Sequence, residues 1–184
     1  GDWFQLYFVE NPGMAYGWKF GGNWGKVALT VFRLGAVIFG TWYLGQIIKK
    51  KYHKGFIFCA ALVYAGALGN LIDSMFYGMI FDKGLTYDPA ISDYLQYSGV
   101  ASVSSNGYSS FLHGSVVDML YFPIFKVGNF EFFSAIFNVA DASISVGVIT
   151  LLIFQKRFFR KAVPDQSSAS IETNTEVSDK VQVS

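Results

Sequence analysis

Three long apolar segments dominate the hydrophobic pattern of the chain. They run roughly over residues 27–48, 55–75 and 139–154. Each is long enough to cross a bilayer as a helix, and no proline interrupts any of them. The pattern therefore predicts an all-α membrane protein, a helical bundle with three transmembrane helices in this chain.

Basic residues at the ends of these segments predict their orientation. Lys49–Lys51 follow the first segment, and Lys156 and Arg157 follow the third. Because short basic loops stay in the cytoplasm, the first segment should run inward, the second outward and the third inward. This places residue 1 outside, although residues 1–26 hold neither a span nor a signal-peptide pattern. We therefore expect a fourth transmembrane helix upstream of this chain.

Polar and mixed stretches fill the rest of the chain. Residues 1–26 alternate locally and mix aromatic residues with Gly and Asn, which predicts a small extracytoplasmic β element. Residues 27–158 form the transmembrane domain, which is the candidate catalytic domain. Within it, residues 81–115 are a long external insertion, and residues 116–137 are typical of strands or an interfacial hairpin. Residues 159–184 predict a disordered cytoplasmic tail.

Composition narrows the function classes. Of the 184 residues, 52% are hydrophobic and only 15% charged, and the mean hydropathy is +0.35. A net charge of +1 gives no field that would attract nucleic acid. The single cysteine, Cys59, excludes an internal disulfide, and His53 and His113 lack metal-ligand spacing. We expect no metal and no cofactor.

Ionisable residues inside the apolar segments are the most informative positions. With a rise of about 1.5 Å per residue, Asp141 stands about 22 Å from the level of Lys156. The same estimate puts Asp73 at about 28 Å from Lys54, and Arg33 at about 24 Å from Lys49. In a hydrocarbon core about 30 Å thick, all three fall near the outer boundary. A charge at that depth is costly and by default indicates a functional site.

Each of these residues also has an ordinary structural interpretation. Asn138 can cap a helix whose first turn contains Asp141. Asp73 can pair with Arg33 and staple two helices together, and Asp118 can be a simple interface carboxylate. Two carboxylates brought together, however, cannot both ionise cheaply and share one proton. Such a pair can take a proton from water and donate another to a carbonyl, as in aspartic proteases.

Four short motifs resemble those of one known family. Asn11–Gly17 resembles its N-x-G-x-A-aromatic element, and Gly66–Asp73 its G-x-x-G-N-x-x-D block. His113–Asp118 is similar to its G-x-V-V-D stretch, and Phe137–Ile144 to its F-N-x-A-D-x-x-I block. The motifs occur in family order and cover residues 11 to about 158. The chain thus resembles prolipoprotein signal peptidase, also called signal peptidase II.

The resemblance implies an intramembrane aspartyl endopeptidase of the bacterial cytoplasmic (inner) membrane, with its site near the outer face. It would remove the signal peptide of a prolipoprotein just before the diacylglyceryl-modified cysteine. Asp118 and Asp141 match the catalytic pair. The positions that match supporting or substrate-contacting residues are Asn11, Gly13, Asn70, Asp73, Asn138 and Ala140. Expected partners are lipidated prolipoproteins, membrane lipids and the inhibitor globomycin, and we expect a monomer.

Two features depart from the family pattern. Ser74 stands where the family block usually has an arginine, and Arg33 could supply the missing cation from another helix. The insertion of residues 81–115 is long, and it could be a lid, a binding surface or a solvated loop. The polar Asp/Lys pair of the family's first helix lies outside this chain.

Three other functions remain open at this level. A small transporter or channel subunit could use Asp73, Asp118 and Asp141 as a proton or cation relay. A membrane scaffold could use the same polar groups to hold helices together. A serine protease built on Ser115 and His113 lacks both the usual motif and an orienting third group.

Overall fold

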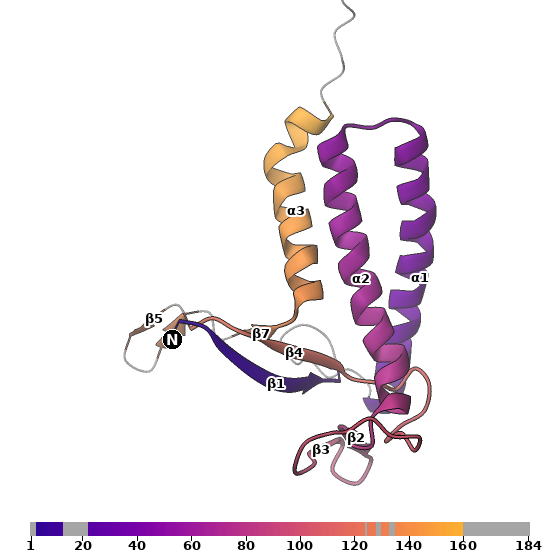
Figure 1. Ribbon diagram of the computed structural model, residues 1–184, viewed down its shortest axis with the longest axis vertical. Coiled ribbons are helices and arrows are strands. Elements are labelled where there is room, and N and C mark those ends of the chain that lie inside the picture. The colour runs from indigo at the N-terminus through magenta and orange to yellow at the C-terminus, as the bar shows by residue number, and fades with distance from the viewer. Residues whose placement is uncertain (1–2, 13–21, 124, 128–129, 133–134, 160–184) are drawn as a thin grey trace, which may run out of the picture.

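The computed structural model describes residues 3–12, 22–123, 125–127, 130–132 and 135–159. Three helices stand side by side: α1 (Gly22–Lys49), α2 (Lys54–Ile80) and α3 (Val139–Phe158) (Figure 1). The middle helix, α2, packs against both of the others. All three are long and apolar enough to cross a membrane, and the chain is a multi-pass membrane protein.

The helices extend beyond the predicted apolar segments. α1 starts at Gly22, and its first turns include Lys26, which is buried with a hydrogen-bond partner. α2 continues past residue 75 to Ile80 and ends where Phe81 adopts an extended conformation. Polar residues at these ends are satisfied by the loops packed against them, so they do not stop the helix as the hydropathy pattern suggested.

Large apolar side chains cover the outside of the bundle. Phe32, Ile38, Phe58 and Ile153 are each more than 60% exposed, one or more from every helix. In water such a surface would be a liability, but in a bilayer it faces lipid. The residues that are buried between helices are few and mostly small or polar.

A small antiparallel sheet lies at one end of the bundle. Its strands are β1 (Gln5–Asn11), β4 (Val116–Tyr121) and β7 (Ile136–Phe137), in the order β1-β4-β7. In the β1–β4 register Val9 faces Asp118 and Asn11 faces Val116. The predicted fold class, a helical membrane bundle with a small β element, is confirmed.

Two hairpins complete the described fold. β2 (Thr86–Asp88) and β3 (Asp93–Leu95) pair inside the insertion of residues 81–115. β5 (Phe125–Val127) and β6 (Phe130–Phe132) pair between β4 and β7. The sheet and the β2–β3 hairpin lie at the end of the bundle away from the α1–α2 connection (Figure 1). The tail of residues 160–184 is outside the described residues.

Candidate active site

Asp118 lies in the middle of β4 and is only 5% exposed. Its Oδ2 accepts a hydrogen bond from Asn11 Nδ2 at 3.1 Å, and its Oδ1 accepts one from Asn138 Nδ2 at 2.9 Å. Burial raises the pKa of the Asp118 carboxyl above its usual value, and the negative charge of Asp141 adds to this rise. The hydrogen bonds from Asn11 and Asn138 act in the opposite direction. Burial is the largest of these effects, so Asp118 holds a proton more readily than a free carboxyl.

Asp141 occupies the first turn of α3. Its backbone N–H donates to Oδ1 of the N-cap residue Asn138 at 2.8 Å, and its carboxylate Oδ1 accepts a bond from Asn70 Nδ2 at 2.8 Å. The carboxylate therefore faces α2 and does not point toward lipid.

Two asparagines connect the carboxylates into one network. Asn138 Nδ2 donates both to Asp118 and, at 3.1 Å, to Oδ1 of Asn70, which in turn donates to Asp141. Asn70 and Asn138 are both buried, at 7% and 5% exposure. Asn138 is thus a helix cap and a link of the network at once, so the two interpretations of this residue do not compete.

Arg33 approaches the network from α1. Its Nη1 donates to Ser74 Oγ at 2.9 Å, and Ser74 Oγ in turn donates to the backbone oxygen of Asn70 at 2.8 Å. The guanidinium interacts electrostatically with Asp141, Asp118 and Asp73. The guanidinium from α1 therefore reaches Ser74 on α2. The sequence had suggested that Arg33 pairs with Asp73, and the hydrogen bond that the structure shows goes to Ser74 instead.

Asp73 and Ala140 lie at the margin of the network. Asp73 is near the Tyr77 hydroxyl and the backbone of Val117, where α2 meets β4. Ala140 packs against α2 so closely that a Cβ added at Gly66 would collide with its carbonyl oxygen. Gly13, also expected at the site, lies outside the described residues.

Sequence reasoning missed a second buried contact beside β4. Lys26 Nζ donates to Ser115 Oγ at 3.1 Å, and the Ser115 N–H donates to the Tyr108 hydroxyl at 3.1 Å. The only available signal was a lysine at the edge of an apolar segment. His113 contacts Ser110 and the Phe111 carbonyl, so Ser115 and His113 do not form a serine-protease pair.

The arrangement joins two carboxyls with different surroundings through neutral amides. Asp118 is buried in a strand, whereas Asp141 lies at a helix start. Neutral donors hold both groups in place without the strong acidification that a direct contact with arginine would produce. Two such carboxyls can share one proton and exchange it with a third molecule.

Comparison with known proteins identifies relatives over most of the chain. A family model described as Signal peptidase (SPase) II matches residues 1–157. The lipoprotein signal peptidase of Porphyromonas gingivalis is 38% identical over 169 residues, covering 84% of this chain and 68% of the relative. That of Amoebophilus asiaticus is 31% identical over 168 residues, covering 85% of this chain and 63% of the relative. A solved structure described as a bacterial membrane enzyme aligns with a TM-score of 0.48 and 22% identity, over 89% of this chain and 73% of the other.

Proposed function

The chain belongs to the signal peptidase II family and is therefore a membrane peptidase, and we propose that it cleaves diacylglyceryl-modified prolipoproteins just before the lipidated cysteine. The relatives named as lipoprotein signal peptidases support this substrate class. Family membership also favours a peptidase over the proton relay and the scaffold considered from sequence.

Asp118 and Asp141 are the proposed catalytic pair. The observation that carries this assignment is the hydrogen-bonded chain Asp118–Asn138–Asn70–Asp141, which joins a strand and two helices at one point. Asp118 carries the shared proton, because its burial raises its pKa. Asp141, in the first turn of α3, is the partner that accepts a proton from water.

The reaction follows from this division of roles. As water attacks the scissile carbonyl carbon, Asp141 takes a proton from it and Asp118 gives its proton to the carbonyl oxygen. In the resulting diol the C–N bond then breaks, and Asp141 passes its proton to the leaving amine of the cysteine. A diol hydroxyl returns a proton to Asp118, so the pair ends in its starting state.

Other residues hold the pair in place. Asn11, Asn70 and Asn138 position the carboxyls through their amide donors, and Arg33 supplies a positive charge nearby, in place of the family's usual arginine at Ser74. Asp73 and Ala140 support the site where α2 meets β4 and α3, and Gly13 is proposed as a substrate-side position from its motif alone.

The site's place in the bundle fits a lipid-modified substrate. It lies at the sheet end of the helices, the end opposite the basic α1–α2 connection (Figure 1). With that connection and the end of α3 in the cytoplasm, the scissile bond is presented at the outer face of the cytoplasmic membrane while the acyl chains stay in lipid. We propose that the enzyme acts as a monomer and that globomycin blocks the same site.

A cleavage assay tests the assignment. The full-length protein in detergent is incubated with a lipidated precursor, and Asp118→Asn and Asp141→Asn are each expected to lower kcat at least about a thousandfold. Asp88→Asn is the matched control, because this carboxylate lies in the β2–β3 hairpin and accepts a hydrogen bond from the nearby Ala90 backbone N–H. Cleavage at near wild-type rate by either active-site variant would rule out the pair.

A further inference from the structure

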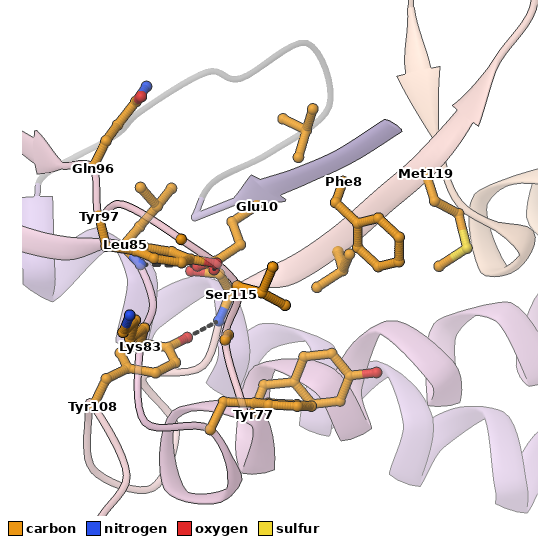
Figure 2. A pocket seen from close by; sticks show the side chains of 16 residues that line it. Phe8, Glu10, Tyr77, Lys83, Leu85, Gln96, Tyr97, Tyr108, Ser115 and Met119 are labelled. Carbon is orange, nitrogen blue, oxygen red and sulfur yellow. Dashed lines mark hydrogen bonds between the residues drawn. The ribbon is translucent and has the colours of Figure 1, made fainter. Parts of the chain in front are cut away.

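A cavity of about 640 Å³ lies between the β1–β4 strand pair, the C-terminal end of α2 and the insertion of residues 81–115 (Figure 2). Phe8 and Glu10 line it from β1, and Met119 lines it from β4. Its volume is within the range of small-molecule and peptide side-chain sites. The proposed chemistry does not use it.

The cavity and the Asp118 side chain lie on opposite faces of β4. Side chains alternate between the two faces of a strand, so Val117 and Met119 point away from the side chain of Asp118 between them. On β1, Asn11 bonds Asp118, whereas its neighbour Glu10 turns toward the insertion. Val9, the register partner of Asp118, also lines the cavity, next to the shift in register between Leu6 and Val9. On β4 the cavity therefore adjoins the face of the strand opposite the Asp118 side chain.

Hydrogen bonds fasten the walls of the cavity. Glu10 accepts the Leu85 N–H at 2.8 Å through one carboxylate oxygen and the Tyr97 hydroxyl at 2.6 Å through the other. The bond to Glu10 raises the pKa of Tyr97 to about 12, so the hydroxyl remains a donor at any physiological pH. Because Glu10 ties β1 to the insertion, and the Tyr108–Ser115 bond holds the insertion together just before β4 begins, the cavity is formed in advance.

The lining is suited to an apolar ligand. Both oxygens of Glu10 accept hydrogen bonds from the cavity walls, and most of the other lining side chains are apolar or aromatic. Phe8 lines the cavity from β1 and Val100 from the insertion, and each is 85% exposed. An apolar side chain that enters the cavity would remove these exposed apolar groups from water, which would favour its binding.

We infer that this cavity binds an apolar side chain of the substrate itself, in the segment that follows the lipidated cysteine. The inference rests on the proposed function. Continuity supports this occupant, since the cavity shares β1 and β4 with the catalytic pair. The signal peptide belongs to the membrane side, so only the segment after the cut leaves toward the end of the bundle where the insertion lies.

The path from the scissile bond to the cavity is short enough for the segment that follows the cysteine. Among the described strands, β1 forms an edge of the sheet, so the chain passes only one strand to reach the other face. Strand spacing and side-chain layers make this path about 15 Å, which about five extended residues cover. The side chain that enters the cavity should therefore lie about five to eight residues after the cysteine.

Substrate pairs test the inference with the full-length enzyme. One lipidated precursor carries Leu and Phe at residues five to eight after the cysteine, a second carries Gly and Ser there, and a third ends at residue two. We expect a KM about tenfold lower for the apolar precursor than for the other two. Val100→Asp should remove this difference and leave kcat unchanged, whereas Val103→Asp, 79% exposed in the same insertion but outside the cavity, should preserve it.

Phe8→Ser, with Leu6→Ser as its control on the same strand, provides a second independent pair. Equal KM values for the apolar and the polar precursor in the wild type would overturn the inference. So would a cavity variant that raises KM for the shortest precursor as much as for the apolar one, because the effect would then be structural.

A crosslinking measurement separates this inference from the proposed function. A benzophenone group at the sixth residue after the cysteine, irradiated with the Asp141→Asn protein, should attach within residues 8–10 or 81–119. This readout needs no turnover. Crosslinks confined to other regions would overturn the cavity assignment even if cleavage is normal, whereas failure of the wild type to cleave any precursor would refute only the proposed function.

Discussion

At the scale of single residues, amides rather than charges organise the site. Asn138 and Asn70 both donate to carboxyls that an arginine could also have held. A guanidinium in direct contact would stabilise the ionised form of a carboxyl group and lower its pKa, and the pair would then lose its shared proton. A neutral amide fixes the geometry with a smaller effect on the pKa. Arg33 does not take this place, because its guanidinium donates to Ser74.

Replacing Asn138 distinguishes its two roles. Serine caps helices about as well as asparagine but is too short to reach Asp118, so Asn138→Ser should keep the cap of α3 and lose at least a hundredfold in kcat. Asn138→Ala removes the cap as well and should cost about 1 kcal/mol more in unfolding free energy. Thermal unfolding in detergent beside cleavage kinetics measures both. Equal loss of stability in the two variants would contradict this separation.

Asn11 should tune the pH profile. Its hydrogen bond favours the ionised form of Asp118, which opposes the larger effect of burial on that pKa. Asn11→Ala removes the bond, so the pKa of Asp118 rises further and the carboxyl keeps its proton to a higher pH. The alkaline limb of kcat/KM against pH should therefore move to higher pH. An unchanged or lowered alkaline limb would contradict the proton assignment.

At the scale of elements, α2 and α3 determine how closely the network is held. A Cβ at Gly66 would lie 2.7 Å from Ile144 Cγ1 and would also collide with the Ala140 backbone oxygen. Backbone cannot give way as a side-chain tip can, so the helices must separate, and the Asn70–Asp141 bond one turn further along α2 must lengthen. Small residues serve this close approach in membrane bundles.

Gly66→Ala should therefore cost about 1–3 kcal/mol in stability and lower kcat by at least tenfold. Gly45→Ala is the control, because a Cβ at that position of α1 meets nothing within 4 Å. It should be neutral or slightly stabilising, since alanine favours helix over glycine. Thermal unfolding and cleavage kinetics measure both variants, and an equal response would show that helix propensity rather than α2–α3 contact is decisive.

Contact between α1 and α2 can be tested by moving the arginine from position 33 to position 74. If Arg33 supplies the cation that relatives usually place at position 74, then Arg33→Ala should lower kcat at least tenfold, and Ser74→Arg in the same chain should restore much of it. Arg33→Lys serves as a partial control, since it keeps the charge and loses the planar donor geometry. Cleavage assays on the three variants decide the point, and no recovery in the double variant would argue against the exchange.

The sequence predicted which candidate residues lie at one level wherever helices determine their positions. A fixed rise per residue was enough to bring Asp141, Asp73 and Arg33 to one level, and the charge of Arg33 does reach both acids. Asp118 could not be placed in this way, because its position depends on the register of β4 with β1, more than 100 residues away in the chain. The Glu10 and Lys26 contacts to the insertion were invisible for the same reason, since non-local pairing leaves no periodic signal.

At the scale of the whole molecule, the bundle has one end with basic residues and another that holds the proposed catalytic pair. Lys49–Lys51 and Lys156 lie at the end shared by the α1–α2 connection and the C-terminal part of α3, whereas β1, β4 and the insertion lie at the other (Figure 1). The orientation that we propose puts the basic residues in the cytoplasm and the carboxylate pair near the outer face, where the proposed lipid-modified substrate would leave the lipid.

Labelling with a membrane-impermeant maleimide tests this orientation in spheroplasts. Val100→Cys, in the insertion, and Lys50→Cys, beside the α1–α2 connection, both place a thiol at an exposed position. We expect the first to be labelled in intact spheroplasts and the second only after the membrane is opened, because the insertion should lie outside and the basic connection inside. The native Cys59 is 1% exposed and should stay unlabelled in the folded protein, so the unsubstituted chain is the blank. Labelling at position 50 before lysis would reverse the orientation and with it the side from which the substrate reaches Asp118 and Asp141.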